Sequence, residues 1–357
     1  MKTIFSIKAL FTIFILTFLL ITTDNFAQWV KVQNPGSRVL SYKTIGEELY
    51  VGTENNGILK STNSGNNWTK IQTNLFETIY DINSFQTRSD TIWIGSYGGG
   101  VIASYDLGTT WHSFSMGFET QPFLLDIELI GDTLYAAITY EIGFLPSGVY
   151  KSSIHNSNWQ LSGTGLSGTI FGVMDLLITS NGTMYLASAL AGPKGNVNIS
   201  LDNGKTWLNR AIPNIADVNI LFEAGNKIYA GTSGGIFYTT NNGEAWFSLS
   251  EELNRYYVDD IIVYDNFIFA AVDQVGIIVS PDDGTTWNNI SGNLVIEDDY
   301  ISNIYIYKDH LFASLNAVNG VWKYPLSLTG NNDEELSNKF ILAQNYPNPF
   351  NPTTSIK

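Results

Sequence analysis

The amino-acid sequence predicts an all-β fold built from a repeated four-stranded unit, and three observations lead to this expectation. Aromatic residues make up 13% of the 357 residues and glycine occurs 32 times, a composition that favours rigid strands separated by tight turns. A short turn motif recurs along the chain. A strand pattern, in which an aromatic residue is followed by small residues, recurs with it.

The turn motif has the pattern Ser/Thr-x-Asp/Asn-x-Gly-x-Thr-Trp. Its Asp or Asn is expected to accept hydrogen bonds from the following backbone N–H groups, and its glycine to take a positive φ. The Trp is expected to begin the next strand and to bury its indole between neighbouring sheets. The clear copies carry Asn63, Asp106, Asp202, Asn241 and Asp282 in the turn, and Trp68, Trp111, Trp207, Trp246 and Trp287 at the end. A degenerate copy ends at Trp159, with Asn156 at the glycine position.

The spacing of the copies predicts the architecture. The Trp residues lie 39 to 48 residues apart, the length of one four-stranded blade of a β-propeller. The strand pattern occurs seven times, and the last repeat, around Trp322, lacks its own turn and final Trp. The segment Trp29–Val32 resembles Trp68–Ile71 in residue type. We therefore predict a seven-bladed β-propeller of four-stranded antiparallel blades over residues 28–327, closed by the N-terminal strand.

The turn motif resembles the Asp-box, or BNR, repeat of sialidases, sortilin-type receptors, some plant-cell-wall glucanases and photosystem II assembly factors. Five clear copies cover nearly the whole chain after its N-terminal segment. The resemblance implies a propeller in which the Asp boxes are scaffold and lie on the face opposite to a ligand site.

The two ends of the chain indicate export. In residues 1–27, Lys2 and Lys8 precede an apolar run, and Ala27 offers a small residue for cleavage, as in a signal peptide. Residues 328–339 are polar and acidic and are expected to form a linker. Residues 340–357 resemble the start of the C-terminal sorting domain of type IX secretion, truncated because that domain is several times longer. This resemblance implies a secreted or outer-surface protein that meets the type IX machinery.

Charge and composition exclude several classes of function. The net charge of −15, without a basic patch, repels nucleic acid. The chain has no cysteine, so it has no disulfide, thiolate zinc site or thiol nucleophile. We expect a monomeric propeller with no cofactor other than, at most, Ca²⁺.

The residues of known Asp-box enzymes are poorly matched. The resemblance to sialidases implies a cluster of three arginines, but this chain has only Arg38, Arg88, Arg210 and Arg255, at different repeat positions. Asp-box glucanases generally use two propellers to form a cleft, and this chain has one. We therefore expect a binding or scaffold module for a glycan or protein ligand, without catalysis. The alternative is a glycoside hydrolase with a divergent site, which would place two or more carboxylates beside an Arg or Tyr in one pocket. A third interpretation is an assembly factor of the photosystem II type.

One set of polar residues is predicted to form a ring. Alignment of the repeats places Ser41, Asp81, Asp126, Asp175, Asn219, Asp260 and Asn303 near the start of each innermost strand. A ring of these side chains at the channel mouth suits a cation such as Ca²⁺. The alternative is that each caps a backbone turn between blades. Aromatics of the blade linkers, including Tyr256 and Tyr257, are expected to join the ring residues in binding a ligand, or to fill the seams between blades.

Overall fold

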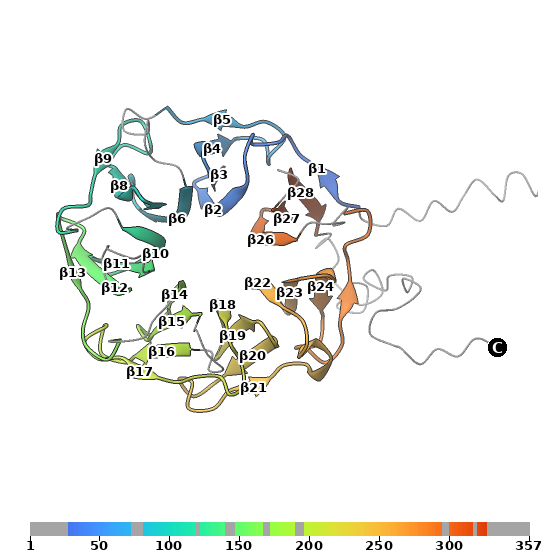
Figure 1. Ribbon diagram of the computed structural model, residues 1–357. Helices are drawn as coiled ribbons and strands as arrows, with labels where there is room; N and C mark the ends of the chain where they lie inside the picture. The colour runs from blue at the N-terminus through green and yellow to red at the C-terminus, as the bar shows by residue number, and fades with distance from the viewer. Residues whose placement is uncertain are drawn as a thin grey trace, which may run out of the picture.

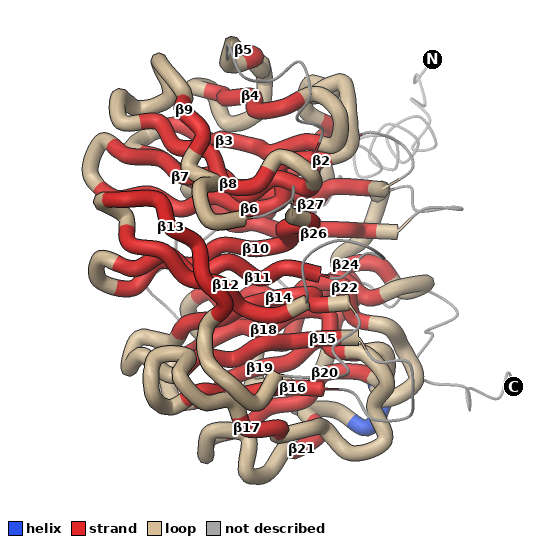
Figure 2. The backbone as a smooth tube through the Cα atoms, turned by 60° about the vertical axis from the view of Figure 1, so that its left-hand side comes forward, coloured by secondary structure: helices blue, strands red, loops and turns tan. Residues whose placement is uncertain are grey.

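The structure is a computed structural model that describes residues 28–72, 81–118, 122–139, 147–166, 172–189, 196–294, 300–316 and 320–326. The expected signal peptide, linker and sorting segment lie outside these residues. The described residues form β-sheets arranged as a ring around a central channel (Figure 1). Within the described residues, no helix is long and apolar enough to cross a membrane, since the helix η1 (Glu251–Leu253) is a single short turn (Figure 2).

Five of the sheets have four antiparallel strands each. The first contains β2 (Val39–Ile45), β3 (Glu48–Thr53), β4 (Gly57–Ser61) and β5 (Thr69–Lys70). The second contains β14 (Val173–Ile178), β15 (Met184–Ser188), β16 (Asn196–Ser200) and β17 (Leu208–Asn209). The third contains β18 (Val218–Ala224), β19 (Lys227–Thr232), β20 (Gly235–Thr239) and β21 (Phe247–Ser248). The fourth contains β22 (Val258–Tyr264), β23 (Phe267–Val272), β24 (Gly276–Ser280) and β25 (Asn288–Asn289). The fifth contains β26 (Ile301–Tyr307), β27 (His310–Leu315), β28 (Gly320–Pro325) and, from the other end of the chain, β1 (Val30–Lys31).

The remaining strands form one eight-stranded sheet. Its members are β6 (Asp81–Arg88), β7 (Thr91–Tyr97), β8 (Gly100–Ser104), β9 (His112–Ser113), β10 (Phe123–Ile130), β11 (Thr133–Thr139), β12 (Gly148–Ser153) and β13 (Asn156–Leu161). The prediction of seven separate four-stranded blades is therefore wrong: five blades are four-stranded sheets, and eight strands are joined into one.

A single residue pair causes this join. Strand β7 extends to Tyr97 and β10 begins at Phe123, and these two residues pair across the sheet. Their rings lie 4.3 Å apart between centroids, and the Gly98 N–H donates to the Pro122 carbonyl at 3.0 Å. The aromatic contact and the backbone bond hold the two strand ends together, which the repeat pattern alone did not indicate.

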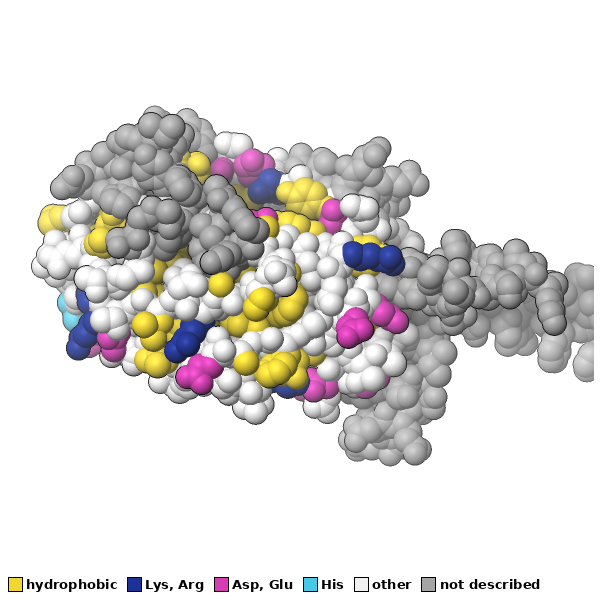
Figure 3. Space-filling model, turned by 60° about the horizontal axis from the view of Figure 1, so that its bottom comes forward, with side chains coloured by type: hydrophobic (Ala, Val, Ile, Leu, Met, Phe, Trp, Pro, Cys, Tyr) yellow, Lys and Arg dark blue, Asp and Glu magenta, His cyan; other side chains and the backbone are white. Residues whose placement is uncertain are grey.

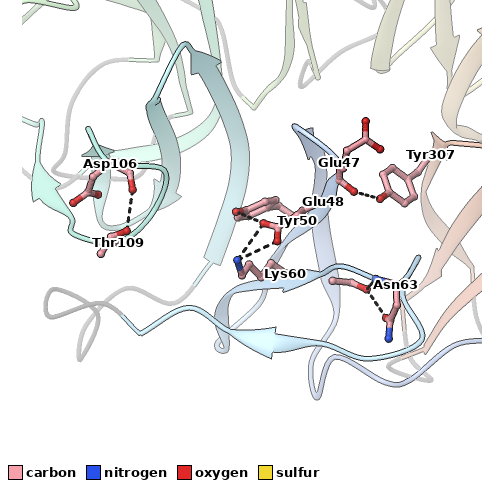
Figure 4. A network of polar contacts seen from close by, with 9 residues as sticks. Glu47, Glu48, Tyr50, Lys60, Asn63, Asp106, Thr109 and Tyr307 are labelled. Atoms are coloured by element: carbon pink, nitrogen blue, oxygen red, sulfur yellow. Dashed lines mark hydrogen bonds and ion pairs between the residues drawn. The ribbon is translucent and has the colours of Figure 1, made fainter.

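The predicted closure by the N-terminal strand is confirmed. Strand β1 pairs antiparallel with β28, Val30 opposite Lys323 and Lys31 opposite Trp322 (Figure 1). Beside it, the Trp29 indole is 2% exposed and its Nε1 donates to the Ile290 carbonyl at 2.7 Å. The first and last repeats also meet nearer the channel, where the Tyr307 hydroxyl donates to the Glu47 carbonyl (Figure 4). Closure therefore pairs backbone N–H and C=O groups of β28 that would otherwise lie at an open sheet edge.

The hydrophobic core is divided among the interfaces between successive repeats. One cluster, for example, combines Tyr50 and Ile58 of one sheet with Ile82 and Trp111 of the next. Small residues on the second strands permit this close approach, since a Cβ on Gly52 would lie 2.3 Å from the Ile82 carbonyl oxygen. Gly52 is the small residue that follows Tyr50 in the aromatic-small pattern, so the pattern provides this close approach.

The innermost strands line the channel. These strands are β2, β6, β10, β14, β18, β22 and β26, each adjacent to the next, with β26 adjacent to β2. Figure 1 shows them around the centre of the ring, with the two-residue outer strands at the rim. Because the strands of each repeat run antiparallel, the start of the innermost strand and the turn motif lie at opposite ends of the sheet.

Candidate ligand-binding channel

A β-bulge near the start of every innermost strand sets the position of the ring residues. Beyond the bulge, Ser41 pairs with Gly52, Asp126 with Ala137 and Asp260 with Ala271. The register places at this equivalent position Ser41, Ser84, Asp126, Asp175, Ile220, Asp260 and Asn303.

Two residues of the predicted ring are therefore misplaced. Asp81 is the first residue of β6 and bridges to Glu54, and the ring position of that strand belongs to Ser84. Asn219 lies within the bulge of β18, one residue before the ring position. Sequence spacing could have revealed both shifts, because the bulge recurs at the same place in every innermost strand and keeps the spacing nearly constant. Ser84 lies eleven positions before its partner Gly95, and Ile220 before Gly231, as Ser41 lies before Gly52.

The ring carboxylates connect neighbouring repeats. Oδ2 of Asp175 accepts the Leu221 N–H at 2.7 Å, and Oδ2 of Asp260 accepts the Ile304 N–H at 2.8 Å. The Ser84 hydroxyl donates to Oδ1 of Asp126 at 2.5 Å. Each of these bonds runs from one innermost strand to the next. This geometry matches the second of the two interpretations of the ring, in which its side chains cap backbone groups between blades.

Burial inside the ring raises the pKa of these carboxyl groups. Desolvation, opposed by hydrogen bonds from Ser84 and from backbone N–H groups, raises the pKa of Asp126 to about 6. Desolvation likewise raises the pKa of Asp260 to about 7. For Glu128 and Asp175 the pKa is raised well above the usual value, first by desolvation and then by the charge of Asp126.

The ring residues do not fit a Ca²⁺ ion. Both carboxylate oxygens of Asp260 accept backbone N–H groups, those of Ile261 and Ile304. Within the described ranges, no group of three or more His, Cys, Asp or Glu side chains is placed to hold a metal. A Ca²⁺ ion needs six to eight oxygen ligands at once, which oxygens already engaged with the backbone do not supply.

The channel does contain a polar cavity of about 360 Å³. Three carboxylates, of Asp126, Glu128 and Asp260, line it together with the Lys43 ammonium group and the Tyr305 ring. The Tyr305 ring stacks on Tyr42, with centroids 5.3 Å apart and planes 5° from parallel. A cavity of this size accommodates a small ligand or one or two side chains of a partner.

Sequence reasoning missed Lys43, Gln86 and Glu128, which lie two residues beyond the ring position on their strands. Residues two apart on a strand lie on the same face, so a signal was available once the ring position was known. The correct register was needed to find Gln86, because counting from Asp81 leads to a different residue.

The loop face around the channel mouth carries Asn219, Tyr256 and Tyr257. The Tyr257 hydroxyl donates to Oδ1 of Asn219 at 2.8 Å, which joins two neighbouring innermost strands. Close by, Asp259 has its pKa raised to about 7 by burial and by the charges of Asp273 and Asp260. Tyr256 is half-buried against the core, with the Arg255 guanidinium 5.1 Å from its ring centroid. Tyr256 therefore contributes to packing as well as to this face.

The recurring turns lie at the opposite end of the sheets. In the turn of Asp106, Oδ1 accepts the Thr110 N–H at 2.7 Å and Oδ2 accepts the Thr110 hydroxyl at 2.7 Å. Gly108 has a φ of 88° and donates its N–H to the Ser104 hydroxyl at 2.8 Å. In the other clear turns, Oδ1 of the turn residue likewise accepts the N–H of the residue four positions later; these turn residues are Asn63, Asp202, Asn241 and Asp282. Figure 4 shows the Asn63 and Asp106 turns on adjacent repeats.

The degenerate copy departs from this geometry. Asn156 begins strand β13 and pairs with Ser153, so it does not take the positive φ of the glycine it replaces. A two-residue hairpin at Ile154 and His155 stands in place of the longer turn. The prediction for Asn156 is wrong because strand pairing continues through it.

The Trp residues that follow the turns differ in exposure. Trp111, Trp159 and Trp207 are buried. Trp68, Trp246 and Trp287 are partly exposed. Most of their indole N–H groups donate to a backbone carbonyl of the neighbouring repeat, as Trp159 does to Phe114 at 2.7 Å. Trp111 and Trp287 instead donate to the glycine of their own turn, Gly108 and Gly284.

No protein-family model matches the sequence, and no curated protein is similar enough to it to match. Solved structures share the fold. A structure described as YCF48 bound to D1 peptide is 16% identical, with a TM-score of 0.68 over 87% of this chain and 98% of that one. The extracellular domain of the putative one component system BT4673 from B. thetaiotaomicron is 15% identical, with a TM-score of 0.67 over 84% of this chain and 40% of that one. PorZ, a surface component of the type-IX secretion system of Porphyromonas gingivalis, is 12% identical, with a TM-score of 0.62 over 82% of this chain and 47% of that one. These likenesses establish the β-propeller fold.

Proposed function

We propose that this chain is a secreted or cell-surface propeller of the Asp-box type that binds a protein partner on its loop face, around the channel mouth. The observation that carries the proposal is the combination of part-exposed aromatic rings and carboxyl groups on that face. Tyr97 and Tyr300 are each 37% exposed there, and the carboxyl groups of Asp259 and Asp273 lie close to one another on the same face. Aromatic rings are enriched at protein interfaces, and a polar rim commonly surrounds them.

The similar structures support a protein partner. One of them is described as bound to a peptide, another is an extracellular domain, and a third is a bacterial surface component. A role outside the cell also rests on residues 1–27, proposed as a signal peptide, and on residues 340–357, proposed as the start of a type IX sorting domain.

A glycoside hydrolase remains the second candidate, because the channel gathers Asp126, Glu128 and Asp260 beside Tyr305. A glycoside hydrolase was expected to show this arrangement, with two or more carboxylates beside a Tyr in one pocket. One feature favours binding. The carboxylates of Asp126 and Asp260 are already engaged by neighbouring groups.

Binding and hydrolysis assays on the same ligands distinguish the two functions. The purified chain is applied to peptide and glycan arrays, and the glycans are tested in parallel for release of reducing sugar. We expect peptide binding that weakens in Tyr300→Ala but not in Leu201→Ala, a residue 59% exposed on the opposite, turn-bearing face. Sugar release that disappears in Glu128→Gln would instead establish the hydrolase, and binding to glycans alone would replace the protein partner by a glycan.

A further inference from the structure

The polar side chains that line the channel cavity use their donors on the protein itself. The amide groups of Asn83 and Gln86 donate to the backbone carbonyls of Leu124 and Ile127, at 2.8 and 3.0 Å. Ser41 donates its hydroxyl proton to the Ile82 carbonyl at 2.8 Å. Since a backbone carbonyl only accepts, these bonds also determine which way each amide group points.

The acceptors of the same side chains remain available. With its Nε2 directed to the backbone and to Glu128, Gln86 leaves its Oε1 as an acceptor, and Asn83 similarly leaves its Oδ1. In the described part of the chain, no donor is found for either amide oxygen, whereas the Glu128 carboxylate accepts the Leu129 N–H and the Gln86 amide. Neither amide oxygen is a fully buried unsatisfied atom, so both are accessible to solvent.

The charged groups that line the cavity also favour a ligand that donates hydrogen bonds and carries positive charge. Three carboxylates line it, and the single opposing charge among the described lining residues is Lys43. The Lys43 ammonium acts on Asp126 and Glu128 through its field, but none of the described carboxylates lies within 4 Å of it as an ion pair. Burial raises the pKa of all three carboxyl groups, so a cation should bind best above about pH 7, where their negative charge exceeds the single positive charge of Lys43.

We propose that this cavity binds a guanidinium group, such as that of an arginine side chain of the protein partner. This inference rests on the proposed function and identifies the group that the channel recognises. A planar guanidinium presents five N–H donors in a fixed geometry, which suits a wall of amide and carboxylate oxygens. The stacked rings of Tyr42 and Tyr305 add an aromatic surface on which the guanidinium can lie.

Calorimetric titration of the purified chain with N-acetyl-arginine amide tests the proposal directly. We expect binding that is lost with N-acetyl-citrulline amide, which has nearly the same shape but no charge. Glu128→Gln should weaken binding roughly tenfold or more, because it removes a carboxylate partner of a buried charged group. The matched control is Glu244→Gln, whose carboxylate is 65% exposed outside the channel.

Lys43→Met supplies a second variant that tests the same charge balance in the opposite direction. Removal of the competing ammonium should strengthen binding by about threefold to tenfold, an effect that a folding defect would not produce. Equal binding of the citrulline compound, or no gain in Lys43→Met, would overturn the guanidinium site.

The peptide array separates this inference from the proposed function. If arginine-containing peptides bind and lose affinity on Arg→citrulline replacement, both proposals hold. If peptides bind regardless of arginine, the loop-face function stands and the channel site is wrong. If the arginine amide binds but no peptide does, the site accepts a free guanidinium compound and the protein partner is wrong.

Discussion

Leu107 adopts a backbone conformation that its side chain resists. Its φ is 53°, in the left-handed region, and it occupies the turn position immediately before Gly108. Asn203 and Asn242 occupy the equivalent position in other turns with φ of 58° and 54°. Asparagine tolerates this region better than leucine does, because its short polar side chain can bond locally.

We therefore expect Leu107→Asn to stabilise the protein by about 1 kcal/mol, since the left-handed conformation costs a branched residue roughly that amount. The measurement is urea unfolding followed by tryptophan fluorescence. The reciprocal change, Asn203→Leu, should destabilise by a similar amount. A destabilised Leu107→Asn would show that the exposed leucine makes a contact worth more than the strain.

Asp260 connects two repeats through its carboxylate, and its removal tests the capping role of the ring. Asp260→Ala leaves the N–H groups of Ile261 and Ile304 without their acceptor. An unsatisfied buried N–H costs about 1 to 3 kcal/mol, so we expect a loss of about 2 kcal/mol in unfolding free energy. Asp260→Asn retains one acceptor oxygen and should lose less. The exposed Glu252→Ala serves as the control, and a loss no larger than the control's would contradict the capping role.

At the residue scale, the sequence predicted the turn residues well and the ring only in part. The turn pattern is local, so spacing along the chain was enough to predict that Asp106 accepts backbone N–H groups that follow it and that Gly108 takes a positive φ. Ser84 was missed because the acidic Asp81 was aligned with the other carboxylates, although Ser84 is the residue that lies eleven positions before Gly95, as Ser41 lies before Gly52. Positive φ at Leu107, one residue before the glycine, was also not anticipated.

The closing strand is the element on which the last sheet depends. Trp29, next to β1, packs against Tyr324 with ring centroids 5.3 Å apart, and Asn293 exchanges two hydrogen bonds with its backbone. Removal of this indole would open a cavity at the junction between the two ends of the chain.

Trp29→Ala should lower the unfolding free energy by about 3 to 5 kcal/mol, the usual cost of removing a large buried aromatic side chain. Val30→Ala is the matched control, because Val30 is 54% exposed on the same strand and should change stability little. Differential scanning calorimetry of both variants provides the comparison. An equal effect of the two substitutions would mean that the strand closes the ring without help from the indole.

The outer strands present a different surface from the channel. Leu208 of β17 and Phe247 of β21 are 47% and 51% exposed on neighbouring sheets. Figure 3 shows hydrophobic side chains dispersed among uncharged and charged ones on this side of the molecule. These outermost strands are only two residues long, which limits the edge available for pairing with another chain.

For the whole molecule, the raised pKa values inside the ring determine how stability responds to pH. The folded state holds protons on Asp126 and Asp260, with pKa values of about 6 and 7, more tightly than the unfolded chain does. A raised carboxyl pKa favours the folded state at low pH, and this advantage is lost as pH rises through the folded pKa. Glu128 and Asp175 act in the same direction.

We therefore expect the melting temperature to rise as pH falls from about 8 to about 5, which reverses the usual behaviour of paired surface carboxylates. The turn residues Asp106 and Asp202 have pKa values lowered to about 2 by hydrogen bonds from Thr110 and Thr206, so they stay charged over this range. Calorimetric melts across the range test the expectation, and Asp260→Asn should flatten the slope. A flat or inverted profile would show that the ring carboxylates remain ionised.

Local patterns in the sequence were enough to predict the features that arise from neighbouring residues or from one repeated unit. These are the all-β repeat, the Asp and Asn turns, and the pairing of the N-terminal strand with the last repeat. The tertiary structure decided the features that depend on register between strands and on residues far apart in the chain. One pairing of Tyr97 with Phe123 joined eight strands into a single sheet, and closure brought Lys43 and Glu128 into one cavity. The physical reason is that turns are stabilised by local hydrogen bonds, whereas register and cavities are settled by packing across the whole ring.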